Sequence, residues 1–228
     1  MRILLIPGFW LSGDSWSAVT LFLADHGIHP DVAELPGRGP KHENRASVGI
    51  MDQIASVVAW LDQSPEPAIL VGHSAGGNIA YGAADQRPLL VEHLILIDTV
   101  PPRHGGIVND SLPTTNGVID FPGVDFFAAD ETRGLVGDVA TTVMKAVNPE
   151  SARCATEPIA LSDPRRLSIP ATIIACTFTA DNYWAWTEHD DEVIEDVSVI
   201  ELPTGHWPQF SRPRELARCL ADSILTSS

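Results

Sequence analysis

The sequence predicts an α/β fold in which helices cover both faces of a doubly wound, mostly parallel β-sheet. Short apolar runs recur along the chain, glycine or proline loops follow them, and stretches with apolar residues at helical spacing lie between them. Strands that alternate with helices usually lie parallel, because the intervening helix returns the chain to the starting edge of the sheet. With 228 residues, 44% of them hydrophobic, the chain can bury a large core within one domain.

The candidate strands are apolar runs of leucine, isoleucine, valine and alanine bounded by loop residues. In chain order they are Arg2–Ile6, Asp31–Leu35, Ala68–Val71, His93–Ile97, Ala171–Cys176 and Val197–Leu202. The candidate helices carry apolar residues three and four positions apart. They are Asp14–Asp25, Ser47–Leu61, Ala75–Asp85 and Arg212–Ile224. These segments show no repeat of fixed period, so a solenoid is not expected.

The stretch at about residues 100–168 interrupts this alternation. It opens with Pro101-Pro102, contains one helical pattern at Asp125–Val147, and offers no convincing strand. Ligands of open α/β sheets bind beyond the carboxyl ends of the strands, and long loops inside compact domains are usually functional. We therefore expect a single domain over residues 1–228 in which this stretch forms a small lid above the ligand-binding edge.

The acidic composition argues against several kinds of partner. The formal net charge is −16 and the isoelectric point is about 4.6. Such a surface repels nucleic-acid phosphates and anionic lipid headgroups, so we expect no nucleic acid and no membrane as partners. No apolar run reaches membrane-spanning length, and the opening MRILLIPGFW is too short in apolar residues for a signal peptide, so a cytoplasmic location is expected. The oligomeric state stays open.

Metal and cofactor motifs are missing from the sequence. Cys154, Cys176 and Cys219 show no spacing typical of a disulfide framework or a zinc site. The histidines lack HExxH spacing, no GxGxxG follows a strand, and no P-loop occurs. We expect neither a cofactor nor a metal ion.

A sharp turn between a candidate strand and a candidate helix carries the main chemical signal. Residues 72–77 have the sequence GHSAGG, which is a G-x-S-x-G pattern in strand–turn–helix context. Such a turn strains the backbone of its serine, and residues two positions away must lack bulky side chains. The hydroxyl then projects clear of the sheet, so Ser74 is the candidate nucleophile. The amide of Ala75, at the start of the helix, is placed to stabilise an oxyanion.

With these motifs in view, the chain resembles the α/β-hydrolase superfamily over nearly its whole length. The segments that carry the resemblance are LLIPGFWLSGDSW, ELPGRG, VGHSAGG, LILIDTVPP and GHWPQFSRPREL. Two of them, PGFWLSGDSW and GHWPQFSRP, are similar to the branch of small carboxylesterases and hydroxynitrile lyases with modest lids. The resemblance implies the α/β-hydrolase fold, with a small lid inserted after the sixth strand of the family's sheet, and a Ser–His–Asp triad.

His206 is the candidate general base. A serine hydroxyl is a weak nucleophile until a positioned base takes its proton, and histidine does so near neutral pH. His206 follows the last candidate strand and precedes the last candidate helix, which brings it to the same sheet edge as Ser74 in the chain order Ser, Asp, His. His73 adjoins the nucleophile, but neighbouring side chains diverge at such a turn.

The resemblance leaves more than one residue open for the triad acid. In the family the acid usually occupies the loop after the strand that corresponds to Ala171–Cys176, where Asp181 lies. Some members take it from the strand before, where Asp98 ends the run LILID. Asp190 and Asp191 are weaker candidates because they lie in a charged run. We expect Asp181, with Asp98 as the main alternative.

The second oxyanion donor and the substrate pocket are expected near the loop after the first strand. By resemblance, the amide of Phe9 is the donor, and Gly8 lets the backbone approach closely. Most relatives carry histidine before this glycine, where this chain has Pro7, so what braces the loop is unassigned. Trp10 and Trp207 lie near the proposed site residues in sequence, and we expect them to line an apolar pocket.

These residues predict a carboxylesterase-like serine hydrolase that cleaves a small, largely apolar ester through an acyl-enzyme. Arg38 and Lys41 are the only cations close to the ELPGRG loop, so a phosphate or carboxylate group on the substrate is not expected. Fold and triad do not choose the substrate. A thioesterase, a lactonase, a hydroxynitrile lyase-like C–C lyase and a non-catalytic ligand-binding homologue remain alternatives.

Overall fold

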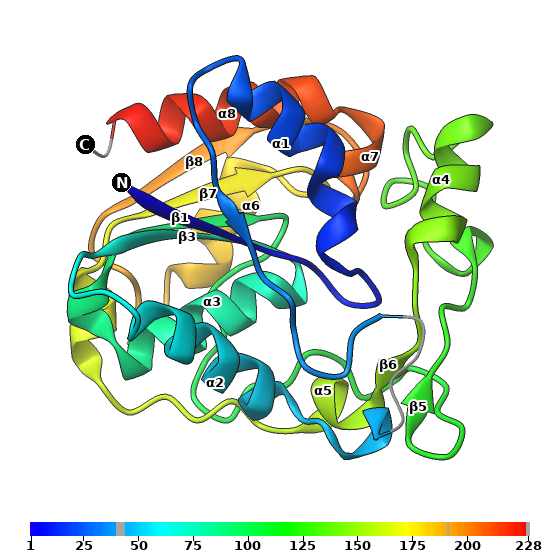
Figure 1. Ribbon diagram of the computed structural model, residues 1–228, viewed down its shortest axis with the longest axis horizontal. Helices are drawn as coiled ribbons and strands as arrows, with labels where there is room; N and C mark the ends of the chain where they lie inside the picture. Colours follow the sequence, from blue (N-terminus) through cyan, green and yellow to red (C-terminus); the bar gives the residue numbers. More distant parts are fainter. Residues whose placement is uncertain (40–43, 191, 227–228) are drawn as a thin grey trace.

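The central sheet contains six strands in the order β2-β1-β3-β4-β7-β8, and its neighbouring strands pair in parallel (Figure 1). The computed structural model describes residues 1–39, 44–190 and 192–226. The strands of the sheet span Arg2–Ile6 (β1), Asp31–Val32 (β2), Ala68–His73 (β3), Val91–Ile97 (β4), Ala171–Ala175 (β7) and Val197–Glu201 (β8). The doubly wound, parallel architecture predicted from the sequence is confirmed, although β2 is shorter than the predicted Asp31–Leu35.

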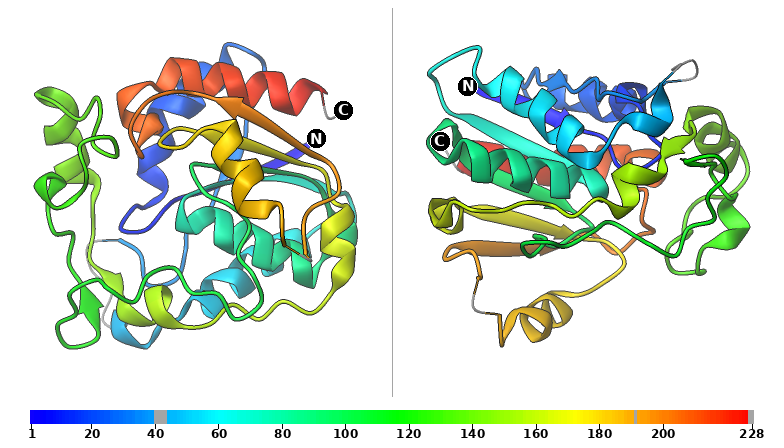
Figure 2. Two further views of the ribbon diagram at one scale, coloured as in Figure 1. Left: turned by 180° about the vertical axis from the view of Figure 1, so that it is seen from behind. Right: turned by 90° about the horizontal axis from the view of Figure 1, so that it is seen from below.

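Helices pack on both faces of the sheet (Figures 1 and 2). One face carries α1 (Ser17–Ala24), α7 (Pro208–Ser211) and α8 (Pro213–Thr226), and the other carries α2 (Ile50–Leu61), α3 (Ala75–Gln86) and α6 (Ala180–Thr187). Short 3₁₀ turns lie at Gly13–Trp16 (η1), Arg45–Ser47 (η2), Pro88–Leu90 (η3), Val124–Phe126 (η4) and Pro164–Ser168 (η5). Among the described residues, no helix is both long and apolar enough to cross a membrane.

The sheet separates two apolar layers. Leu70 and Val71 are neighbours on β3, and because strand side chains alternate, they enter opposite layers. Leu70 packs in the layer that holds Ile54 of α2, and Val71 packs in the layer that holds Leu220 of α8. All four side chains are fully buried. This burial on both faces explains why the central strands are continuous apolar runs rather than alternating ones.

Residues 100–168, here called the excursion, leave the sheet after β4 and return at β7. They contain a two-stranded antiparallel pair, β5 (Val118–Ile119) and β6 (Glu150–Ser151), with α4 (Asp138–Ala146) and α5 (Ala152–Thr156). The expectation that no strand occurs here is therefore wrong, because strands of two residues leave no periodic signal. The helical pattern at Asp125–Val147 forms an α-helix only over α4. In Figures 1 and 2 the part of the excursion with β5, β6 and α4 lies beyond the carboxyl ends of the strands, and its last part returns past α3 to the start of β7.

A buried ion pair anchors the end of the excursion to the body of the protein. The side chain of Arg166, in η5, is 3% exposed, and its Nη1 lies 3.3 Å from the carboxylate of Asp85 in α3. Its Nη2 also donates to Glu192. The Asp85 carboxylate additionally accepts hydrogen bonds from the amides of Ser162 and Asp163. These contacts fix the segment that leads into β7. They lie at the C-terminal end of α3, whereas the serine turn lies at its N-terminal end.

Candidate active site

Ser74 occupies the turn between β3 and α3 with a strained backbone, at φ 52° and ψ −125°. Two glycines make this turn possible. A Cβ atom on Gly72 would lie 2.4 Å from the carbonyl oxygen of Gly76, and a Cβ on Gly76 would lie 2.4 Å from that of Ile6. The Ser74 amide donates to the Ile97 carbonyl at 3.0 Å, which ties the turn to β4. The backbone therefore holds the hydroxyl at the carboxyl edge of the sheet, as the sequence pattern indicates.

His206 lies against this hydroxyl. Its Nε2 is 2.9 Å from Ser74 Oγ, and its backbone amide donates to the carbonyl of Glu131 in the excursion at 2.7 Å. The preceding Gly205 permits this approach, because a Cβ there would lie 2.4 Å from the same Glu131 oxygen. The structure thus brings together the serine and histidine that the sequence singled out, across 132 positions of chain.

The carboxylate beside His206 belongs to Asp98, at the end of β4. Its Oδ2 lies 2.6 Å from His206 Nδ1, and its side chain is only 1% exposed. Its Oδ1 accepts hydrogen bonds from the amides of Cys176 and Thr177 at 2.9 and 2.8 Å. Burial raises the pKa of the Asp98 carboxyl, but the hydrogen bond to His206 and these amides outweigh it, so that the pKa lies below its ordinary value. Asp98 is therefore held as the carboxylate.

Asp181 does not contact His206, which corrects the expectation from the sequence. The chain after β7 turns at once into α6, where Thr179 is the N-cap and accepts a hydrogen bond from the Asn182 amide. Asp181 consequently lies in the first turn of this helix, on its exposed side, where a carboxylate suits the helix dipole. Of the weaker candidates for the acid, Asp190 pairs with Arg103, and Asp191 lies outside the described residues. Lys41, the cation near the ELPGRG loop, also lies outside them.

His73 is a buried neighbour of the site whose part the sequence did not reveal. Its Nε2 lies 2.6 Å from the His206 carbonyl, and its Nδ1 lies 3.3 Å from the side-chain amide of Gln209. Burial lowers its pKa to about 3, and the nearby His206 adds to the effect. The neutral ring therefore donates from Nε2 to the backbone of the His206 loop, which agrees with the sequence argument against His73 as the base.

The residues expected to supply oxyanion donors flank Ser74. Ala75 begins α3, and Phe9 lies in a turn after β1 that the Leu11 amide closes by donating to the Gly8 carbonyl at 3.2 Å. Phe9, Trp10 and Ala75 are buried in one apolar cluster. That the amides of Phe9 and Ala75 donate hydrogen bonds to a developing oxyanion stays a prediction.

A cavity of about 320 Å³ opens at Ser74 and His206. Phe9, Trp10 and Trp207, which lie outside the excursion, also line the cavity. The excursion contributes Val108, Asn109, Leu112, Phe126, Phe127 and Glu131. The rings of Trp10 and Trp207 both meet Phe127 edge to face, with centroids 5.8 and 5.0 Å apart. The structure therefore places both expected tryptophans in the wall of an aromatic cavity that ends at the serine.

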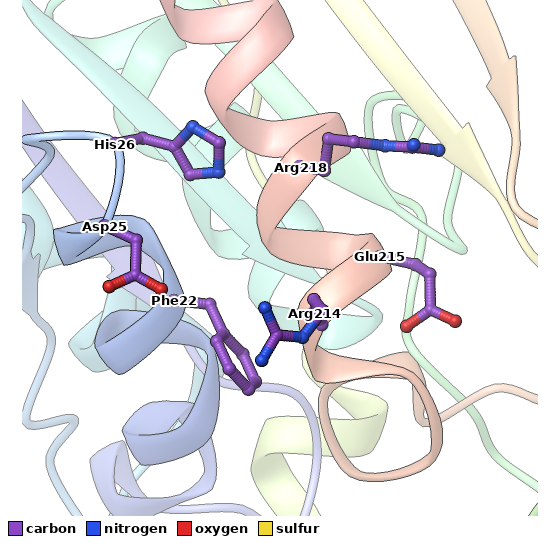
Figure 3. A pocket seen from close by; sticks show the side chains of 6 residues that line it. All are labelled: Phe22, Asp25, His26, Arg214, Glu215 and Arg218. Carbon is purple, nitrogen blue, oxygen red and sulfur yellow. The ribbon is translucent and has the colours of Figure 1, made fainter.

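Another hollow lies between α1 and α8, apart from this cavity (Figure 3). Its lining residues are Phe22, Asp25, His26, Arg214, Glu215 and Arg218. The charged groups are exposed, and the guanidinium of Arg214 lies over the Phe22 ring at 4.3 Å. It offers no buried polar group aimed at a ligand. Within the described part of the chain, no group of three or more His, Cys, Asp or Glu side chains could hold a metal ion.

A parallel α/β sheet whose serine turn meets a histidine and a buried aspartate defines a protein of the α/β-hydrolase class. A family model described as the alpha/beta hydrolase family matches residues 3–219. The chain belongs to this family, and its resemblance to the small esterases within it is confirmed.

Individual relatives are similar over all or part of the chain. A pyrethroid hydrolase of Sphingobium wenxiniae is 27% identical over 96% of this chain and 86% of the relative. A pimeloyl-[acyl-carrier protein] methyl ester esterase of Klebsiella pneumoniae is 31% identical, but over 44% of this chain and 37% of the relative. Among solved structures, a methylesterase from Arabidopsis superposes with a TM-score of 0.78, covering 99% of both chains at 17% identity. The last likeness shows the fold alone.

Proposed function

We propose that the protein is a serine esterase that hydrolyses a small, largely apolar carboxylic ester through an acyl-enzyme. The observation that carries this proposal is the continuous chain of hydrogen-bonding distances from Ser74 Oγ through His206 to Asp98 at the end of an aromatic cavity. The names of the relatives support the same reaction class, because one is called a pyrethroid hydrolase and the other a methyl ester esterase.

The first half-reaction forms the acyl-enzyme. His206 Nε2 takes the proton of Ser74 Oγ while this oxygen attacks the ester carbonyl carbon. The carbonyl oxygen becomes an oxyanion that the amides of Phe9 and Ala75 stabilise. Asp98 orients the imidazole through Nδ1 and stabilises its charged form. As the C–O bond to the alcohol breaks, His206 Nε2 returns the proton to the leaving oxygen.

The second half-reaction regenerates the enzyme. A water molecule gives its proton to His206 Nε2 and attacks the acyl carbon, and collapse of the second oxyanion releases the carboxylic acid while Ser74 recovers a proton. No step needs a cofactor. The excursion supplies much of the cavity wall, so it acts as the lid of this single domain.

The aromatic lining favours a substrate with a neutral, apolar body. Phe9, Trp10, Phe127 and Trp207 are aromatic residues of the lining, and Glu131 is an acidic one. Aromatic side chains stabilise apolar ligand groups through burial, and a carboxylate repels substrates that carry their own negative charge. A neutral small-molecule ester therefore fits better than an anionic one.

Covalent labelling with a fluorophosphonate, followed by peptide mapping, tests the proposal together with turnover of short-chain p-nitrophenyl esters. We expect the label on Ser74, and we expect Ser74→Ala to lower kcat by roughly 10⁶-fold, because the serine acts as part of a triad. Turnover of esters without any label on Ser74, or neither label nor turnover in the intact protein, contradicts it. Cleavage of cyanohydrins with no ester turnover would indicate a lyase instead.

A further inference from the structure

The turn that carries Phe9 is a strained element. Its central residue Trp10 has a φ of 63°, in the left-handed region that non-glycine residues rarely occupy. Within the turn, the Leu11 amide donates to the Gly8 carbonyl at 3.2 Å. Pro7, just before it, has no side-chain donor with which to brace the turn. A strained backbone persists only where surrounding groups hold it in place, so the conformation calls for an external support.

Arg38 provides that support from the loop after β2. Its Nη1 donates to the Gly8 carbonyl at 2.5 Å and to the Leu11 carbonyl at 2.6 Å, at the two ends of the turn. Its Nη2 lies 3.5 Å from the side-chain oxygen of Gln53 in α2. The Arg38 side chain is only 3% exposed. One nitrogen of a nearly fully buried guanidinium thus bridges both ends of the turn, and the planar group fixes its position.

The contact at Gly8 bears directly on the amide of Phe9. The Gly8 carbonyl and the Phe9 N–H belong to one planar peptide group and point in opposite directions. A guanidinium fixed on the carbonyl oxygen therefore fixes the direction of the N–H. It also draws electron density toward that oxygen, which makes the N–H a stronger donor. The group expected to meet the oxyanion is set by a side chain that does not touch the substrate.

Glu150 links this arrangement to the excursion. It lies in β6, its side chain is fully buried, and its carboxylate pairs with Arg38 Nε. The segment just before β6 also bonds to the backbone of the turn, because the Asn148 amide donates to the Trp10 carbonyl at 2.8 Å. Trp10 Nε1 donates in turn to the Ile119 carbonyl in β5 at 3.2 Å. The turn is therefore held directly from β5 and from Asn148, which lies just before β6.

We infer that Arg38 is a positioning residue for the Phe9 oxyanion donor and that Glu150 couples this donor to the seating of the excursion. The inference rests on the proposed function, because it assigns Arg38 a part in the same reaction. Arg38 acts through the peptide group between Gly8 and Phe9, and the buried charge of Glu150 keeps the guanidinium in its place.

The test compares Arg38→Met with Arg166→Met, a matched control that removes the other buried, ion-paired arginine away from the serine turn. An oxyanion donor is typically worth about 10²–10³ in rate, and a misdirected one retains part of that value. We expect Arg38→Met to lower kcat on a p-nitrophenyl ester, and the rate of fluorophosphonate labelling at Ser74, by about 10- to 100-fold with KM nearly unchanged. Arg166→Met should lower the melting temperature and leave kcat intact.

A second readout separates positioning from a merely structural effect. A trifluoromethyl ketone that adds to Ser74 forms an oxyanion, whereas the corresponding alcohol cannot. We expect Arg38→Met to weaken the ketone in proportion to the loss of kcat and to leave the alcohol's affinity unchanged. Arg38→Lys, which keeps the charge but lacks the further guanidinium nitrogens that face Gln53 and Glu150, should recover only part of the activity.

Folding of the variants is controlled by the double change Arg38→Met with Glu150→Met, which leaves no unpaired buried charge. The inference is overturned if the folded single or double variant keeps wild-type kcat and labelling rate, or if ketone and alcohol lose affinity equally. A wild-type protein that neither takes the label at Ser74 nor turns over any ester refutes the proposed function itself. Normal wild-type turnover with an unaffected Arg38 variant refutes only the inference.

Discussion

Ser74 and Asp98 share a backbone feature that fixes their separation. Each is the first residue after its strand, with φ values of 52° and 49°. Their strands pair directly, in a register that sets His73 opposite Ile97. The Ser74 amide donates to Ile97, and the Asp98 amide donates to Ile174 of β7. Two of the three groups in the proposed triad are therefore positioned by the ladder of the sheet, and only the histidine depends on a loop.

Replacing each carboxylate in turn by an amide tests whether Asp98 or Asp181 is the triad acid. We expect Asp98→Asn to lower kcat on a neutral ester by roughly 10⁴-fold, because an amide does not stabilise the imidazolium and favours the wrong tautomer. Asp181→Asn is the matched control, since that side chain is exposed in α6 and should leave kcat unchanged. Steady-state kinetics on both folded variants decides. A large loss in Asp181→Asn beside an active Asp98→Asn would refute the assignment.

The sequence singles out Ser74 and His206 as candidates because each has a local signal. The serine has glycines that its turn demands, and the histidine has a loop between the last strand and the last long helix. The acid has no such signal, since the short segment from Thr177 to Asp181 looks the same whether it forms a loop or the start of a helix. The sequence does not reveal what Arg38 and His73 contact, because their partners lie at Gly8, Leu11 and His206, far away in the chain.

At the scale of elements, three segments meet around the ring of His73. The ring caps the end of β3, bonds to the His206 carbonyl, and lies near Gln209 of α7. It also excludes a side chain at Gly8, where a Cβ atom would be 2.5 Å from its Nδ1. The loop after β1, the serine turn and the His206 loop are thus packed against one neutral imidazole.

This junction predicts a pH-dependent stability. The native pKa of His73 is lowered to about 3 from the usual 6.5. Between these two pH values the unfolded chain therefore binds a proton at His73 that the native protein does not bind. The free energy of unfolding should therefore fall as pH drops from about 6.5 to about 4.5, with this group contributing up to about 1.4 kcal/mol per pH unit. Urea denaturation across that range measures the slope.

His73→Gln provides the comparison for this slope. Glutamine lacks the titrating ring, so the variant should lose the contribution of His73 while other groups titrate as before. The pH range of the experiment ends above the pH at which Asp98, with its lowered pKa, begins to take up a proton. Equal slopes in the two proteins would contradict the explanation.

The elements of the sheet could be predicted from the sequence, and those of the excursion largely could not. Buried parallel strands need continuous apolar runs, and such runs mark β1, β3, β4 and β7. The pair β5–β6 spans two residues in each strand and is held by contacts with distant segments, such as the bond from Trp10 to Ile119. Helix α6 has its apolar contact mainly through the buried Tyr183, too little to create a periodic pattern.

At the scale of the whole molecule, the net charge of −16 should act on the encounter with charged substrates. We expect kcat/KM for an ester with a cationic alcohol group to fall as the salt concentration rises, and kcat/KM for an anionic counterpart to increase. The reason is screening, because the Debye length falls from about 30 Å at 0.01 M salt to about 3 Å at 1 M. A neutral isostere is the control. Identical salt responses for the three esters would contradict the prediction.

The placement of His206 also affects when the protein becomes reactive during its synthesis. Translation delivers Ser74 and Asp98 on neighbouring strands long before it delivers the imidazole, and α8, which follows His206, packs against α1 near the beginning of the chain. In the proposed mechanism, a nascent chain therefore carries an inert hydroxyl until its late segment docks. Reactivity of Ser74 toward a fluorophosphonate is thus also a direct reporter of completed folding.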